Sequence, residues 1–257
     1  MQNLIVRVAV VSCFFLPFQV HASMNRWLLG TGIVFPSLNG SLTFNSAALP
    51  AQTATALGAD YLFSEVSGPG SGRTAIASIA TGRESWGVGY GVVSNWVEGA
   101  GSSASTADFA GLAGRFGDLG VGLLARDLIL SEGGSLDLRY ALHYEAGGGL
   151  HLAGVFTSDL NDAQVGVGWR RSSLFCFEIN ADLPMNSGEN TGLSAGLKGE
   201  GQVIGGSIVA SSALSSGSGL SDPTFALALS ARLGSRLALI AQRPNTGLYT
   251  VGFNLAL

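Results

Sequence analysis

The feature that most constrains the fold of this chain is a two-residue alternation of apolar and polar side chains. Residues 136–145, LDLRYALHYE, show it clearly: leucines and tyrosines occupy one series, and charged residues with Ala141 and His143 occupy the other. Successive side chains of a β-strand point to opposite faces, so this stretch predicts a strand with one apolar and one charged face. A soluble sheet would bury the apolar face, whereas a membrane-spanning barrel would turn it outward into lipid.

The composition favours the membrane arrangement. Only 12% of the 257 residues are charged, 47% are hydrophobic and 38 are glycine, which is too apolar for an ordinary soluble surface. After the first few dozen residues, no uninterrupted apolar run reaches the roughly 18 residues that a membrane-spanning helix needs. The sequence therefore predicts an all-β protein, a transmembrane antiparallel up-and-down β-barrel.

The N-terminus has the features of a secretory signal peptide over residues 1–22. Arg7 precedes an apolar run at 8–18, and a small-residue cleavage site follows at 20–22. Cleavage after Ala22 leaves 12 basic and 17 acidic residues, a formal net charge of about −5. The mature chain therefore lacks the basic surface of a nucleic-acid-binding protein, and we expect no nucleic-acid partner.

The chain contains two cysteines, Cys13 and Cys176. Lipid attachment at Cys13 is an alternative to simple cleavage, although only five residues separate it from Arg7. If Cys13 leaves with the signal, Cys176 has no intrachain partner, and we expect a packed side chain. No CxxC pair and no cluster of His and Cys at zinc spacing occurs, and His21 is removed with the signal. The sequence therefore predicts neither a metal site nor a cofactor.

Alternating segments recur from Ala54 to the C-terminus, separated by Gly, Asp, Asn, Ser or Pro. Division at these residues predicts fourteen strands, with twelve as the alternative if the ends of the sheet are divided differently. The predicted strands cover residues 55–66, 73–82, 86–96, 107–116, 119–127, 136–145, 149–158, 163–171, 174–183, 191–199, 203–212, 224–232, 235–242 and 246–257.

The connections between these segments fall into two classes. Those after even-numbered segments are mostly tight, such as GD at 117–118 and SS at 172–173. Those after odd-numbered segments are mostly longer, such as 97–107 and 213–223. Short turns at one rim and long loops at the other are typical of outer-membrane barrels, in which the turns and both termini lie in the periplasm. A β-sandwich has no reason to sort its connections in this way.

The alternation also assigns side chains to the two faces of the wall. Phe177 and Ile179, for example, flank Glu178. Because Arg or Lys facing lipid near the membrane midplane costs about 2–4 kcal/mol, we expect the charged series to face the lumen. Their mixed signs indicate pairing across the bore, either as a network that supports the barrel or as a solute site. The predicted lumen-lining residues are Asp137, Arg139, His143, Glu145, Arg170, Glu178, Asp182, Lys198, Arg232 and Arg236.

Two tryptophans give a check on length. Trp86 and Trp96 lie ten residues apart in the apolar register of one segment. In a strand tilted by about 40°, they would be separated by roughly 25 Å along the membrane normal, the height of the apolar band between two aromatic girdles. We therefore predict that both lie at membrane interfaces; ordinary half-buried tryptophans are the alternative. The intervening glycines, such as Gly87 and Gly89, indicate close approach or a bend.

The last segment alternates to the end of the chain, with Tyr249, Val251, Phe253, Leu255 and Leu257 in one register. It resembles the C-terminal signal that is read by the outer-membrane assembly machinery, although that signal usually ends in an aromatic residue and Leu257 stands here. The resemblance implies the assembly machinery as a partner and the outer membrane as the location.

A short motif precedes the predicted barrel. FNSAALP at 44–50 resembles the NPA-type motif near the N-terminus of the FadL-like family of outer-membrane channels for hydrophobic compounds, with Ser46 in place of the family's proline; the matching residues are Asn45, Ala47, Ala48 and Leu49. The resemblance implies a fourteen-stranded barrel, a plug that blocks the lumen, and a hydrophobic ligand that leaves through the wall. Residues 23–54 are therefore predicted to be a plug, or alternatively a periplasmic leader, ahead of a barrel at 55–257.

Three functions are open at this point. The first is a channel for hydrophobic or small solutes, similar to the FadL-like family. The second is a closed structural or assembly barrel whose loops bind another protein. The third is a lipid hydrolase that uses His143 or His151 with a nearby serine and carboxylate, although sequence alone places no such atoms within hydrogen-bond reach. We expect the protein not to be an enzyme, with membrane lipid around it and hydrophobic small molecules as candidate ligands.

Overall fold

A computed structural model describes residues 32–37, 40–64, 72–97, 105–129, 136–172, 175–184, 191–200, 203–215, 219–220, 224–233, 237–244 and 248–257. The predicted signal peptide lies outside these residues. Four three-residue 3₁₀ helices occur in the described part: η1 (Gly40–Leu42), η2 (Ser46–Ala48), η3 (Pro50–Gln52) and η4 (Gly147–Gly149). None of the described helices is long and apolar enough to cross a membrane.

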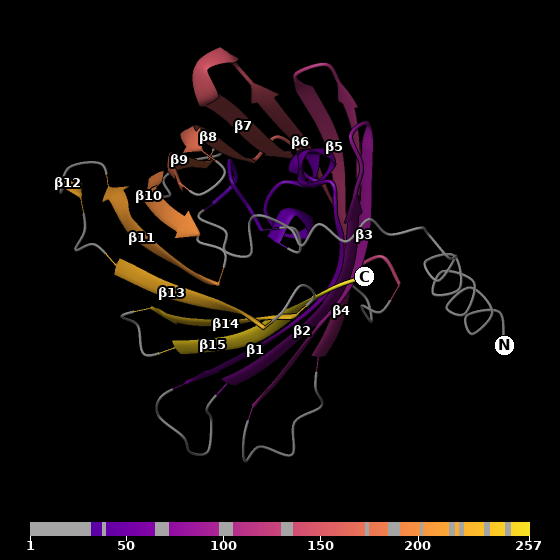
Figure 1. Cartoon of the computed structure of the whole chain (residues 1–257), viewed down its shortest axis with the longest axis vertical. Helices are drawn as coiled ribbons and strands as arrows, with labels where there is room; N and C mark the ends of the chain where they lie inside the picture. The colour runs from indigo at the N-terminus through magenta and orange to yellow at the C-terminus, as the bar shows by residue number, and fades with distance from the viewer. Residues whose placement is uncertain are drawn as a thin grey trace, which may run out of the picture.

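Strands make up nearly all the rest of the described chain. Their bounds are β1 (Thr55–Ser64), β2 (Gly72–Gly82), β3 (Trp86–Val97), β4 (Ser105–Phe116), β5 (Leu119–Arg126), β6 (Asp137–Glu145), β7 (Leu150–Thr157), β8 (Asp162–Ser172), β9 (Phe175–Pro184), β10 (Thr191–Glu200), β11 (Ile204–Ser215), β12 (Gly219–Leu220), β13 (Thr224–Leu233), β14 (Leu237–Pro244) and β15 (Leu248–Ala256). Except for β12, each pairs antiparallel with the ring strands that precede and follow it along the chain, and β1 also pairs with β15, which closes the ring (Figure 1).

The predicted fold class is confirmed: the chain forms a closed antiparallel barrel of fourteen strands, not twelve. The two-residue strand β12 pairs only with β11 and lies outside the ring, in which β11 pairs with β13. The predicted segments match the observed strands to within three residues at every end. This agreement follows from the turn residues, which interrupt the alternation where the chain reverses direction.

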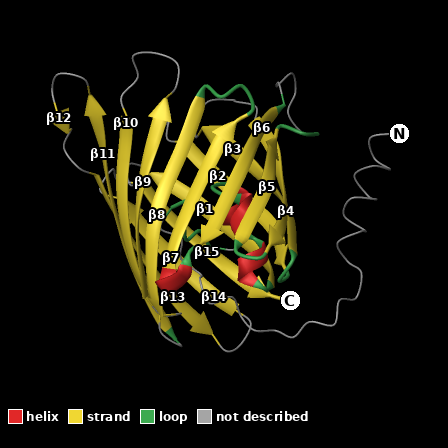
Figure 2. Ribbon diagram, turned by 90° about the horizontal axis from the view of Figure 1, so that it is seen from above, coloured by secondary structure: helices red, strands yellow, loops and turns green. Residues whose placement is uncertain are grey.

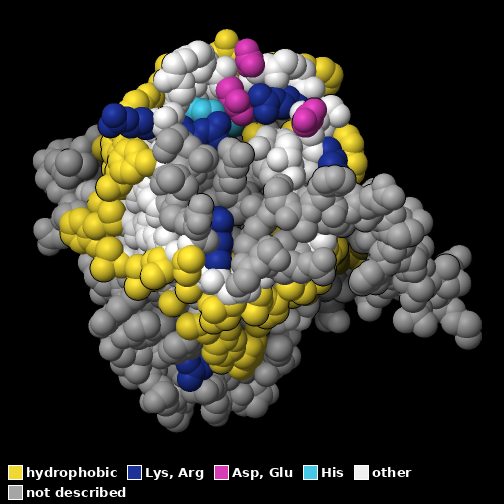
Figure 3. Space-filling model, viewed as in Figure 1, with side chains coloured by type: hydrophobic (Ala, Val, Ile, Leu, Met, Phe, Trp, Pro, Cys, Tyr) yellow, Lys and Arg dark blue, Asp and Glu magenta, His cyan; other side chains and the backbone are white. Residues whose placement is uncertain are grey.

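The apolar series faces outward, as the alternation predicted. In β6, Tyr140, Leu142 and Tyr144 are 41–50% exposed, whereas Ala141 and His143 are at most 5% exposed. In Figure 3, apolar side chains line the left and lower flanks, and the acidic and histidine side chains in view lie together with several Lys and Arg side chains in the upper part. An apolar outer wall and a polar interior are what a membrane-spanning barrel requires.

Residues 32–37 and 40–52, here called the inner segment, lie inside the ring of strands (Figures 1 and 2). Leu42 and Leu49 are completely buried and pack against Ala80, Phe109 and Ala113 of β2 and β4. This cluster is one of two apolar cores among the described residues, and it lies between the inner segment and the wall. The inner segment and the inner face of the wall thus form the buried core together.

Glycines on the inner face make room for this segment. A Cβ on Gly89 of β3 would overlap the side chain of Leu42, and a Cβ on Gly122 of β5 would overlap Ser46 and the backbone of Ala47. The close approach expected for the glycines of β3 is therefore an approach of the inner segment to the wall.

Candidate lumen site

The strand register places the nominated charged residues on one side of the wall. Asp137, Arg139, His143 and Glu145 alternate in β6 with the outward tyrosines and leucines. Cross-strand pairing carries the same inward register to the corresponding residues of the following strands, which are Arg170, Glu178, Asp182, Lys198 and Arg232. Arg236 lies outside the described residues.

Two buried charges hold the inner segment at Phe35. The Phe35 N–H donates to Glu178 Oε2 at 2.7 Å, and Lys198 Nζ donates to the Phe35 carbonyl at 3.0 Å. Glu178 is fully buried and Lys198 is 1% exposed. Asn180 also donates to the other oxygen of Glu178, at 3.1 Å. Such deeply buried charges are tolerated only when they are hydrogen-bonded, so the backbone of Phe35 forms part of their solvation.

Asn45 holds the inner segment at a second point. Its side-chain amide donates to the carbonyl of Ile33 at 2.9 Å and to that of Leu142 on β6 at 3.2 Å. Its side-chain oxygen accepts from the Ala47 N–H at 3.1 Å, which caps η2. Asn45 is fully buried, as are the other residues of the FNSAALP stretch that resemble the NPA-type motif: Ala47, Ala48 and Leu49. One asparagine thus joins two parts of the inner segment and the barrel wall.

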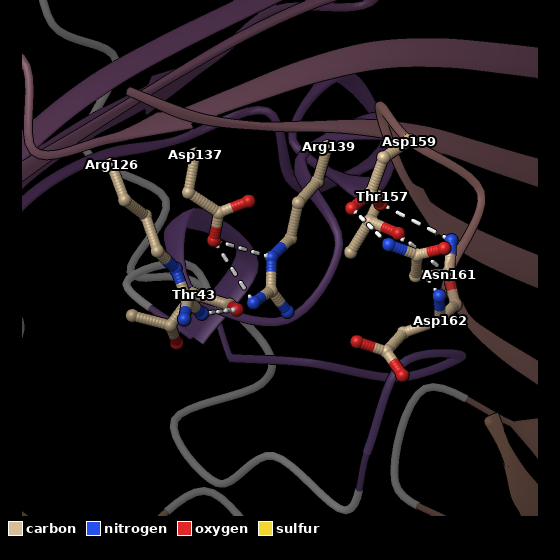
Figure 4. Close-up of polar contacts among 8 residues, drawn as sticks. All are labelled: Thr43, Arg126, Asp137, Arg139, Thr157, Asp159, Asn161 and Asp162. Atoms are coloured by element: carbon tan, nitrogen blue, oxygen red, sulfur yellow. Dashed lines mark hydrogen bonds and ion pairs between the residues drawn. The ribbon is translucent and has the colours of Figure 1, made fainter. Parts of the chain in front are cut away.

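Arginine makes a third contact, near the rim that carries the long loops. Arg126, at the end of β5, donates to the Thr43 carbonyl at 3.0 Å. Close by, Arg139 binds the Asp137 carboxylate through both Nε and Nη2 at 3.0 Å (Figure 4). In the adjoining connection between β7 and β8, hydrogen bonds from Thr157 and Asn161 lower the pKa of Asp159 below its ordinary value.

A cavity of about 210 Å³ opens between these groups and β9. Its lining joins inward side chains of four strands, among them Arg139, Thr157, Asp162, Gln164 and Asp182. One cation and two carboxylates therefore face the same space, which suits a small polar or charged solute better than an oily one.

The two histidines come together at the other end of β6, beside the 146–149 turn. His143 and His151 are 5% and 3% exposed, and their ring centroids lie 5.4 Å apart. Glu145 is the direct cross-strand neighbour of His151, and its Oε2 accepts from Arg115 Nη2 at 3.1 Å. Among the described residues, neither His143 Nε2 nor His151 Nδ1 has a hydrogen-bond partner, and neither does Ser46 Oγ. The geometry therefore gives no support to a serine–histidine pair.

The two predicted interface tryptophans both lie in the outward register of β3. Trp86 is 38% exposed beside the 83–85 turn, and Trp96 lies near the opposite end, with its ring 6.0 Å from that of Tyr61. Trp169 is also outward and 43% exposed, and its indole donates to the Gly148 carbonyl at the short-turn rim.

The sequence did not predict two arginines that face the lumen, or one aspartate that is buried although it lies in the outward register. Arg115 and Arg126 face inward near the ends of β4 and β5, where the sequence reading did not nominate them. Asp108 has the outward register of β4 and is nevertheless 1% exposed; its carboxylate accepts hydrogen bonds from Tyr90 Oη and from the Ile129 N–H, each at 3.0 Å. The alternation of side chains cannot predict that Asp108 contacts a tyrosine on the neighbouring strand and the backbone of a loop.

The closed ring, apolar outer wall and charged interior define the class of membrane-spanning β-barrels. Comparison with solved structures then finds porins: a triple mutant of the Rhodopseudomonas blastica porin matches with a TM-score of 0.50 at 8% identity, over 79% of this chain and 99% of that chain. A double mutant of this porin gives 0.50 at 9% identity with the same coverage. The KdgM porin gives 0.45 at 7%, also over 79% and 99%.

No protein-family model matches the chain, and no curated protein matches it either. At these identities the likeness to the R. blastica porin concerns the fold alone. The chain thus has the fold of an outer-membrane porin, with an inner segment held in its lumen.

Proposed function

We propose that the protein is an outer-membrane channel for small solutes whose passage is limited by its own inner segment. The supporting observation is the clamp at Phe35: buried Glu178 and Lys198 bind the backbone of the segment from the wall. A barrel that served only as a scaffold could fill its lumen with side chains of its strands, as small barrels do. Here a separate segment occupies the lumen, held by apolar packing and by individual polar contacts, and the polar contacts can be exchanged for water.

The charged cavity indicates the kind of solute. Because Arg139, Asp162 and Asp182 face it from three strands, we infer that the channel admits small polar or charged molecules at the long-loop rim. The outward apolar wall would contact outer-membrane lipid, and the alternating C-terminal strand would be recognised by the assembly machinery. The closed structural barrel differs in predicting no conductance under any condition.

The clamp gives a direct test of this proposal in planar bilayers. The Lys198→Met variant removes the charge that binds the Phe35 carbonyl, and Asn45→Ala removes the link to β6. We expect each variant to show larger or more frequent conductance steps than the unmodified protein, and faster liposome swelling in small sugars. Leu197→Ala is the matched control, because Leu197 is the outward neighbour of Lys198 and is 40% exposed. Equal conductance in all four proteins would contradict the proposal.

An apolar recess on the outer wall favours a second candidate, a channel for hydrophobic compounds similar to the FadL-like family. The recess measures about 590 Å³ and crosses β1, β2, β3, β14 and β15. Its floor contains Ala59, Ala75 and Ala77, and larger side chains such as Tyr61 and Phe253 stand around them. The outward register of these alanines opens the recess toward the surroundings of the barrel.

Filling the recess separates the two candidates. Ala77→Phe should slow the uptake of an alkane or fatty acid by vesicles that contain the protein if hydrophobic compounds use the wall. It should leave sugar-driven swelling unchanged, because Ala77 faces away from the lumen. Unchanged uptake of hydrophobic compounds in this variant would remove the second candidate and leave the first intact.

A further inference from the structure

The histidine pair and Glu145 form a cluster that neither candidate function uses. Strand geometry brings them together: His143 and Glu145 are two residues apart on the inner face of β6, and His151 lies opposite Glu145 on β7. One ligand atom from each residue lies within 4.8 Å of the other two. In a tetrahedral site with bonds of about 2.1 Å, ligand atoms lie roughly 3.4 Å apart, so small side-chain rotations would bring all three onto one ion.

The two imidazoles are held in the wall with unused ring nitrogens. Both side chains are more than nine-tenths buried, and within the described part of the chain His143 Nε2 and His151 Nδ1 have no hydrogen-bond partner. A buried polar atom without a partner is unfavourable by about 1–3 kcal/mol, so two in one cluster favour a bound group that interacts with both nitrogens. Neutral imidazole nitrogen is the commonest metal ligand in proteins.

Neighbouring groups orient the cluster as they do in metal sites. Arg115 binds one oxygen of Glu145 and leaves the other oxygen for an ion. The Phe35 ring packs edge-on against His151 with centroids 4.9 Å apart, so the inner segment forms one side of the cluster. Hydrogen-bonded carboxylates and fixed ring planes characterise the surroundings of bound metals.

The nearby positive charges restrict the kind of ion. Arg115 is paired with Glu145, and the Arg170 guanidinium lies 6.0 Å from the Phe35 ring centre. These charges oppose Ca²⁺ or Mg²⁺, which prefer several oxygen ligands and more negative charge. Two nitrogens and one carboxylate instead suit Zn²⁺, which binds through nitrogen donors and leaves a fourth position for water. We propose that His143, Glu145 and His151 form a Zn²⁺ site inside the barrel, at the short-turn end and against the inner segment.

The chain provides a clean test of this site. It contains three histidines, and His21 lies in the predicted signal peptide, so the mature protein of residues 23–257 carries only His143 and His151. Mature protein folded in detergent is stripped with a chelator and titrated with ZnCl₂ in a calorimeter, and bound metal is counted by mass spectrometry. We expect one Zn²⁺ per chain, and an intense visible absorption of four-coordinate type when Co²⁺ replaces it.

Variants identify the ligands. His143→Asn and His151→Asn should each weaken Zn²⁺ binding by at least about 100-fold, and Arg115→Gln, which only orients Glu145, by about 10-fold. Asp182→Asn, an inward carboxylate elsewhere, and Cys176→Ala should leave the affinity unchanged. Heat-modifiable gel mobility shows which variants fold, and if a histidine variant does not fold, Glu145→Gln tests the same site with about 10-fold to 100-fold weaker binding expected. No saturable Zn²⁺ binding, or binding retained without both histidines, would overturn the proposal.

Discussion

Close approach at single glycines decides how the inner segment fits against the wall. Gly122 faces inward on β5, where a Cβ would overlap Ser46 and Ala47 of the inner segment. Gly114 faces outward on β4, where the nearest side-chain atoms, those of Phe116, are 3.5 Å from a Cβ. Both glycines lie within strands, so a difference between their substitutions reports the inner segment and not strand propensity.

Valine at these two positions tests the contact. Gly122→Val should reduce the free energy of unfolding by about 1–3 kcal/mol, because the added methyl groups force the inner segment away from β5. Gly114→Val should change it by no more than about 0.5 kcal/mol, since the side chain meets lipid. Urea unfolding in lipid vesicles, followed by tryptophan fluorescence, measures both values. Equal effects would mean that the inner segment does not press on Gly122 in the membrane.

Strands are the level at which the sequence was most informative. The alternation located all fourteen ring strands because it is a local property, read within ten residues. The clamp could not be predicted in the same way, since Glu178 and Phe35 are 143 residues apart and Lys198 and Phe35 are 163 apart. Nothing near Lys198 in the sequence distinguishes it from the other inward charges, and its partner is a backbone carbonyl. Such contacts can be predicted only when the position of the inner segment within the barrel is known, and the local alternation does not give that position.

The register of β6 makes a prediction about lipid contact. Leu142 is outward within the strand, and Leu136 is outward just before the strand begins, at the long-loop rim. Leu142→Arg should lower the free energy of unfolding in vesicles by about 2–4 kcal/mol, whereas Leu136→Arg should cost at most about 1 kcal/mol, because the penalty for a charge falls toward the interface. Because both substitutions replace leucine with arginine in or next to β6, the difference between them reports the depth of the side chain in the membrane. A small, equal cost at both positions would contradict the outward, lipid-facing assignment.

The molecule as a whole consists of a continuous ring and a segment attached to it by fewer contacts. Ladder hydrogen bonds join every strand of the ring to two neighbours, including β10 to β11 and β1 to β15. The described polar contacts of the inner segment with the wall are instead individual side-chain bonds, such as those of Asn45, Arg126 and Lys198. Cooperative units with fewer contacts open at lower free energy, so the two parts should open separately.

Hydrogen exchange followed by mass spectrometry tests this separation in the folded protein. Peptides covering residues 40–52 should exchange through an opening of lower free energy than peptides of β3 to β5, because the inner segment can leave the wall without breaking the ladder. Lys198→Met should speed exchange in residues 32–37 while the strands stay protected, since Lys198 bonds to Phe35 and the ladder of β10 does not depend on its side chain. If the variant loosened the strands and the inner segment together, the segment would be an integral part of the barrel's folding unit. Passage through the lumen would then require unfolding of the wall, which a channel cannot use, so independent release of the inner segment is the physical condition on which the proposed conduction depends.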